Sequence, residues 1–130
     1  MKFILILISL ALFTSCTSNT AEKLNGIWQE TGKENNTITI TDNLLEIHYE
    51  MNTNEKNVVV VLEKKYSYVV RENEINGTLT SKKVFEKDVH SGQLTEVKSS
   101  SKKSAIKLTF ENHALALITP SGKSIPFTKK

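Results

Sequence analysis

Histidine and glutamate alternate in one short stretch of the chain, and both residue types can exchange protons or bind a metal. Glu46, His48 and Glu50 are two residues apart, so on a β-strand their side chains would share one face. Such a set can supply an acid and a base, or a weak metal site, if neighbouring strands add ligands. The same spacing is typical of the outward polar face of an amphipathic strand, and we favour this simpler interpretation.

Other residues with catalytic potential are scattered along the sequence. His90 and His113 stand far from His48, and the sequence has no His-Glu-x-x-His, Gly-x-Ser-x-Gly or phosphate-binding glycine motif. The formal net charge is only +3, the lysine pairs are mostly separated by glutamates, and Arg71 is the single arginine. Nucleic-acid binding needs a more concentrated basic face. We therefore expect a protein that is not an enzyme, has no metal or cofactor and binds no nucleic acid.

The only cysteine, Cys16, follows a stretch typical of exported proteins. Lys2 precedes an apolar run from Phe3 to Phe13, and small residues lead from this run to Cys16. A helix of about 11 residues, rising ~1.5 Å per residue, is too short for a ~30 Å hydrocarbon core. The pattern therefore predicts a signal peptide rather than a membrane span.

Phe13-Thr14-Ser15-Cys16 resembles the lipobox of bacterial lipoproteins, in which the bond before the cysteine is cut and the cysteine is acylated. The family prefers an aliphatic residue where this chain has Phe13. The alternative is an ordinary secretory signal cut near Ala21, which would leave an unpaired cysteine in an export compartment. The resemblance implies a signal peptide over residues 1–15 and lipidation, for example with palmitate, at Cys16.

Lipidation implies a location at the cell envelope. Each buried CH₂ contributes roughly 0.8 kcal/mol, so several acyl chains hold a small domain at a membrane surface. The polar segment 16–23 has no large apolar residue and reads as a tether, and residues 24–130 are long enough for one small domain. We expect a monomer anchored by its N-terminal lipid, in the outer membrane of a Gram-negative bacterium.

Apolar residues recur with a period of two along the domain, which predicts strands. Residues 37–41 and 45–51 alternate, and 58–62 is a β-branched run expected to form a central buried strand. Turn residues separate further runs, and the turn after residue 70 is open between Asn76-Gly77 and Glu72-Asn73-Glu74. The loop-like segment from Ser99 to Ser104 and the final hairpins over 106–127 complete an all-β chain. We expect about 8–10 short strands in a small antiparallel up-and-down barrel.

Leu24-Asn25-Gly26-Ile27-Trp28 resembles the Gly-x-Trp opening of lipocalin-like domains, and residues 106–127 are similar to the last strands of small lipocalin-like lipoproteins. The resemblance implies that Gly26 starts the first strand and that Trp28 closes the bottom of the barrel, often under an arginine near the last strand. This chain has only Lys123, Lys129 and Lys130 there. Trp28 can equally be an ordinary core residue of a β-fold.

Two functions of different classes fit these features. The first is a non-enzymatic envelope module that binds a small apolar ligand or a protein partner. About eight short strands leave an interior just wide enough for side chains, so a filled barrel is the simpler expectation. The second is an inhibitor or immunity-type lipoprotein that blocks a toxin or lytic enzyme through a protruding loop. Interior binding would use positions such as Ile47 and Leu108, and loop binding would use Ser99 to Ser104.

The lipobox-like sequence leads to a test of the anchor. Replacing Cys16 with Ala removes the thiol that carries the lipid, so metabolic labelling with a fatty acid should disappear and uncut precursor should accumulate. Persistent labelling of Cys16→Ala, or a wild-type mature N-terminus that starts after Ala21, would show that the chain is not processed as a lipoprotein.

Overall fold

A computed structural model describes residues 23–130, and Cys16 with the rest of the signal-like segment lies outside this range. Within the described range no helix is both long and apolar enough to cross a membrane. The described residues form nine strands: β1 Gly26–Glu30, β2 Thr37–Ile40, β3 Leu45–Asn52, β4 Val58–Arg71, β5 Glu74–Asp88, β6 Leu94–Ser100, β7 Ala105–Glu111, β8 Ala114–Ile118 and β9 Ser124–Lys129.

Eight of these strands close into an antiparallel barrel, which confirms the predicted fold class. The strands follow the order β4-β3-β2-β1-β9-β8-β7-β5, and pairing between β4 and β5 completes the circle. All the pairs are antiparallel. Most neighbours in the barrel are also neighbours in sequence, so the topology is an up-and-down meander. Only β6 stands outside the circle, as the last strand in the sheet order.

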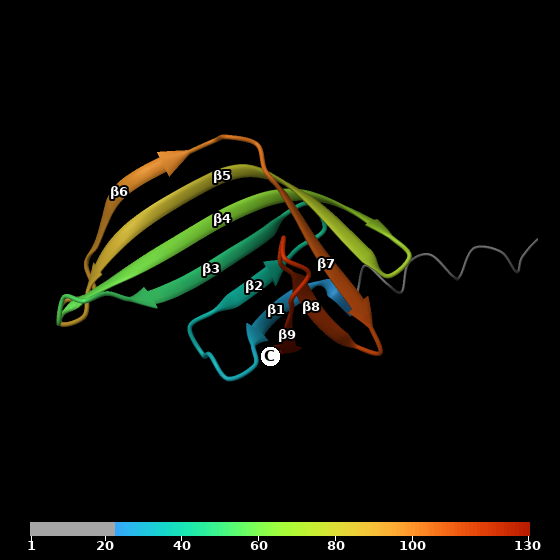
Figure 1. Cartoon of the computed structure of the whole chain (residues 1–130), viewed down its shortest axis with the longest axis horizontal. Coiled ribbons are helices and arrows are strands. Elements are labelled where there is room, and N and C mark those ends of the chain that lie inside the picture. The colour runs from blue at the N-terminus through green and yellow to red at the C-terminus, as the bar shows by residue number, and fades with distance from the viewer. Residues whose placement is uncertain (1–22) are drawn as a thin grey trace, which may run out of the picture.

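β5 has two different neighbours on one of its edges, and this divides the molecule into two parts. Its beginning, Glu74–Thr78, pairs with β7 in the barrel, whereas Lys82–Lys87 pairs with β6. The long β4–β5 hairpin therefore extends beyond the barrel with β6 and the end of β3, and Figure 1 shows these strands arching away from β1, β8 and β9. We call this extension, residues 49–52, 58–65, 81–88 and 94–100, the projecting sheet.

The projecting sheet has an inner face, which continues the wall of the barrel interior, and an opposite outer face. Paired residues of adjacent strands point to the same side of a sheet, and successive residues alternate. Ile47 is buried in the barrel core, so its cross-strand partner Lys64 and the partner of Lys64, Lys82, lie on the inner face. By the same register His48 and Glu63 lie on the outer face.

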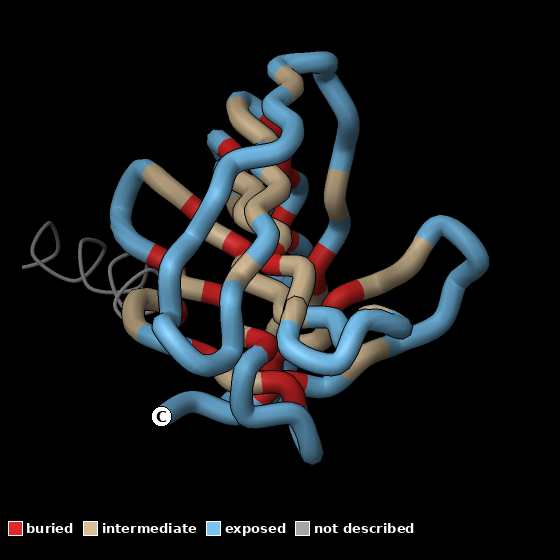
Figure 2. The backbone as a smooth tube through the Cα atoms, turned by 90° about the vertical axis from the view of Figure 1, so that its left-hand side faces the viewer, coloured by how far each residue is buried: buried red, intermediate tan, exposed pale blue. Residues whose placement is uncertain are grey.

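Inward-pointing side chains fill the barrel. Figure 2 shows buried positions alternating with more exposed ones along the strands, and exposed turns. Alternation of this kind is what the period-two sequence predicted. The core cluster consists of Leu24, Trp28, Ile38, Ile40, Leu45, Ile47, Tyr66, Ile75, Leu79, Leu108, Leu115, Leu117 and Phe127.

Trp28 anchors the end of the barrel where β1 meets β9. Its side chain is 1% exposed, its ring stands edge-on to Phe110 with centroids 5.8 Å apart, and its indole N–H donates a 2.8 Å hydrogen bond to the Leu24 carbonyl. The Lys129 ammonium lies 5.7 Å from the centre of the Trp28 ring, within cation–π range. Lys129, on the last strand, is therefore the cation that packs against Trp28.

Gly26 makes room for this lysine. Its φ of +135° lies in a region that residues with a Cβ rarely adopt, and a Cβ here would come within 2.8 Å of Lys129 Cε. Lys129 also donates a 3.1 Å hydrogen bond to the Lys23 carbonyl. Gly26, Trp28 and Lys129 therefore form one packing unit at the β1–β9 junction.

Of the two turns left open after residue 70, the one at Glu72-Asn73 forms and the one at Asn76-Gly77 does not. Asn76 and Gly77 continue β5, and Glu72 adopts a positive φ between β4 and β5. A Cβ on Gly77 would lie 2.6 Å from Ile106 Cγ2, so glycine is needed here for packing against β7 rather than for a turn.

Three further expectations needed correction. β4 and β5 are long, at 14 and 15 residues, because both span the barrel and the projecting sheet. Ser99 and Ser100, expected in a loop, belong to β6 and pair with Lys83 and Lys82. In the run 58–62 only Val61 is buried, because this part of β4 lies beyond the barrel core.

The environment of Trp28 predicts its contribution to stability. Truncating a buried tryptophan to alanine removes its packing and leaves a cavity, at a typical cost of about 3–5 kcal/mol. We expect Trp28→Ala to lower the urea midpoint strongly or to abolish the unfolding transition. Ile27→Ala changes the adjacent, 46% exposed residue and is a matched control that should cost less than about 1 kcal/mol. Equal losses for the two variants would contradict the structure.

Candidate functional site

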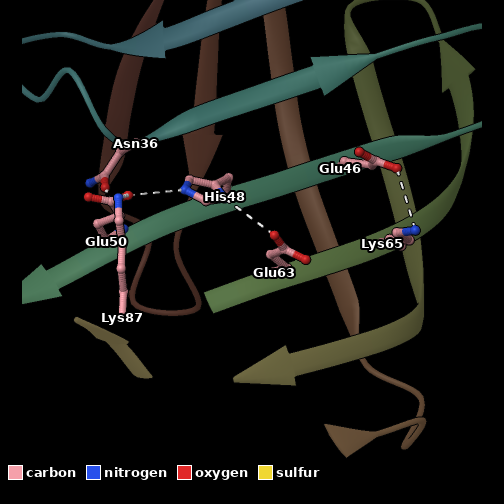
Figure 3. A network of polar contacts seen from close by, with 7 residues as sticks. All are labelled: Asn36, Glu46, His48, Glu50, Glu63, Lys65 and Lys87. Carbon is pink, nitrogen blue, oxygen red and sulfur yellow. Dashed lines mark hydrogen bonds and ion pairs between the residues drawn. The ribbon is translucent and has the colours of Figure 1, made fainter. Parts of the chain in front are cut away.

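The predicted Glu46-His48-Glu50 set lies on the outer face of β3, as its alternation with buried Leu45 and Ile47 indicated. Figure 3 shows His48 between Glu50 on its own strand and Glu63 on β4. His48 Nε2 is 3.6 Å from Glu50 Oε1, and its Nδ1 is 3.8 Å from Glu63 Oε1. These separations exceed hydrogen-bond length, so the imidazole is flanked by carboxylates rather than held by them.

The carboxylates of this set are paired with lysines. Lys87 Nζ lies 3.3 Å from Glu50 Oε1, and Lys65 Nζ lies 3.8 Å from Glu46 Oε1. Glu46 therefore belongs to a separate ion pair and does not reach His48. Among residues 23–130 no group of three or more His, Cys, Asp or Glu side chains is arranged to hold a metal. The outer face is a network of paired charges, matching the simpler interpretation of its sequence.

Asn36 connects this network to the barrel. Its side-chain amide donates a 2.7 Å hydrogen bond to Glu30 Oε2, and its carbonyl oxygen accepts a 3.2 Å bond from the Glu50 backbone N–H. Asn36 immediately precedes β2, and its side chain thus adds one hydrogen bond to the edge of β3 next to the β2–β3 pairing. Glu30 also forms a 3.3 Å ion pair with Lys33, so its buried carboxylate is well satisfied.

A surface groove of about 700 Å³ runs between the β1–β2 loop and the projecting sheet. Its volume suits a small polar molecule. Its two lysines, Lys33 and Lys87, already pair with Glu30 and Glu50, and its apolar contribution comes from Met51, Val59 and Val89. A second hollow of about 510 Å³ lies at the β4–β5 turn around Arg71 and Glu111. Neither hollow brings together an acid, a base and a nucleophile.

The inner face of the projecting sheet has a different electrostatic character. Lys64 and Lys82 stand directly opposite each other on β4 and β5, and both are half-buried. Like charges in this position destabilise a sheet. Burial, followed by repulsion from Lys82, lowers the pKa of Lys64. Among residues 23–130 neither ammonium takes part in an ion pair or a side-chain hydrogen bond.

Apolar side chains surround the two lysines on the inner face. In the next row towards the tip, Tyr49, Leu62 and Val84 stand side by side on β3, β4 and β5. Burial, assisted by the carboxylate of Glu30, raises the pKa of Tyr49 to about 12. Tyr49 therefore stays protonated well above neutral pH and offers the two lysines no negative charge.

The interior positions considered for ligand binding are filled. Ile47 is 2% exposed and Leu108 is completely buried, and both belong to the packed core. The loop considered for partner binding is shortened to residues 101–104 by the end of β6. Cys16 lies outside the described residues.

The two remaining histidines lie in turns, apart from His48. The backbone N–H groups of Ser91 and His90 donate to Asp88 Oδ1 and hold the pKa of that carboxyl below its usual value. His113 has a positive φ at the β7–β8 turn, and its ring stands edge-on to Phe110 at 6.5 Å.

The chain matches no family model, no curated protein and no solved structure.

Two features of this region were missed at the level of sequence. The role of Asn36 depends on where the β1–β2 loop meets β3, which no local pattern encodes. The inward position of Lys64 was predictable from the sequence. Lys64 lies two residues from both Leu62 and Tyr66, so on a strand its charged side chain points to the same side as theirs.

The contacts of Asn36 predict a measurable effect on stability. Asn36→Ala removes two hydrogen bonds and leaves Glu30 and the Glu50 N–H short of a partner, which should cost about 1–3 kcal/mol. The neighbouring Asn35 is exposed, so Asn35→Ala should change stability by less than about 0.5 kcal/mol. Urea unfolding of both variants measures the difference, and indistinguishable midpoints would rule out the bridging role.

Proposed function

We propose that this protein is a non-enzymatic binding module of the cell envelope, tethered to the membrane by lipid on Cys16, that captures a protein partner. The observation that carries the proposal is the filled barrel. Because side chains occupy its interior, a ligand has to bind outside it, and the projecting sheet provides a surface there. The lipobox-like sequence supports the tether and a location at the cell envelope.

The arrangement of polar groups supports binding without turnover. Catalysis requires a nucleophile, acid or base positioned against a reacting group. On the outer face, Glu46 and Glu50 form ion pairs with lysines, and His48 has no nucleophile beside it among the interactions described above. An inhibitor or immunity-type role remains the second candidate, and the projecting sheet favours it because such proteins meet their targets through a protruding element.

Native mass spectrometry of the full chain, purified in detergent, tests this proposal. The spectrum should contain the acylated chain without a retained small molecule, and cross-linking in intact envelopes should yield a complex with one protein. Retention of a small molecule that is lost on enlarging Leu108 or Ile47 would place binding in the barrel and contradict the proposal. Substrate turnover that is lost in His48→Ala or Glu50→Gln would contradict its non-enzymatic part.

A further inference from the structure

Charged side chains are arranged differently on the two faces of the projecting sheet. On the outer face Glu50 and Glu46 form ion pairs with Lys87 and Lys65. There Lys83 stands opposite Glu63 on the neighbouring strand. On the inner face Lys64 stands opposite Lys82 instead, and its other cross-strand neighbour is the apolar Ile47.

Among the described residues, 23–130, no carboxylate forms an ion pair with either of these two lysines. The nearest acidic residue of the inner face along β5 is Glu86, which lies four residues from Lys82 and stands opposite Val60. Across the mouth of the barrel, Glu30 is already bound to Lys33 and Asn36. On β6, the inner-face partner of Val84 is another lysine, Lys98. The inner face therefore carries an excess of positive charge in a partly desolvated position.

Apolar surface continues from the lysines to the tip of the sheet. Leu62 and Val84 are half-buried, and Met51, opposite Val60 on the inner face, is 49% exposed. On β6 the β-bulge opposite Val84 and Phe85 leaves Val97 without a cross-strand partner and 51% exposed. Bulges often occur beside binding sites, where they redirect side chains.

We propose that the inner face of the projecting sheet binds an acidic segment of the partner protein, with a carboxylate between Lys64 and Lys82. The inference rests on the proposed function and specifies the chemistry of its partner. An acidic group removes the repulsion between the two ammonium groups, and apolar side chains flanking it cover Leu62 and Val84. Complementary charge of this kind selects a partner and accelerates its association.

The test uses the full chain in nanodiscs of zwitterionic lipid and a fluorescent peptide with three glutamates flanked by leucines. The same peptide with glutamines is the ligand control. Fluorescence anisotropy should show binding of the glutamate peptide only, and added salt should weaken it because ionic screening shortens the range of the attraction. Equal affinity for the two peptides, or no binding of the glutamate peptide, would overturn the inference.

Adjacent lysines on the same strands provide matched variants. Lys64→Glu and Lys82→Glu should each reduce the affinity for the glutamate peptide by about tenfold or more, whereas Lys65→Glu and Lys83→Glu, on the outer face, should change it less than about twofold. Lys82→Gln should weaken binding without loss of stability, because it relieves repulsion from Lys64. A greater loss in the outer-face variants would overturn the inference and leave partner capture itself intact.

A lipid headgroup is the competing source of negative charge. In the same assay, short-chain phosphatidylglycerol below its micelle concentration should displace the glutamate peptide poorly. Displacement at concentrations comparable with the peptide's own affinity would assign the lysines to lipid and overturn the protein-segment inference. Native mass spectrometry judges the proposed function separately, because it reads out interior binding.

Discussion

Closure of the barrel between β1 and β9 is the constraint on which the rest of the structure depends. Lys129 of β9 stacks over Trp28 of β1, and Gly26 leaves the space in which it does so. With this junction made, inward side chains of eight strands bury one another and fill the interior. β5 is longer than the circle requires, so its second half, with β4 and β6, has to extend beyond it. The filled interior therefore follows from this closure, and the projecting sheet follows from the length of β4 and β5.

The fold was predictable where a residue's local pattern and its tertiary environment agree. Alternation predicted that Leu45 and Ile47 point inward and that His48 points outward, and the final hairpins over 106–127 formed as expected. The local pattern left the turn near Gly77 open, and it did not reveal that Ile106 from a distant strand occupies the space that a Cβ on Gly77 would need. Sequence patterns report local preference, and such long-range contacts override it.

The candidate surfaces were predictable to a smaller extent. The Glu46-His48-Glu50 spacing identified the outer face correctly, but Lys87, which neutralises Glu50, comes from a strand pairing that no spacing reveals. The opposition of Lys64 and Lys82 depends on the register of the long hairpin, which includes a β-bulge between Lys65 and Tyr66. A bulge shifts the pairing of every residue beyond it, so sequence alone leaves this juxtaposition undetermined.

Backbone amide hydrogen exchange tests the central claim, a closed barrel from which β6 is excluded. Gln29 of β1 pairs with Thr128 of β9 across the junction, and backbone amides bonded between these two strands should exchange only on global unfolding. Amides of β6, an edge strand exposed along nearly its whole length, should exchange much faster. The account predicts this order under conditions where the protein stays folded. Exchange at the β1–β9 junction as fast as that in β6 would show an open sheet and contradict it.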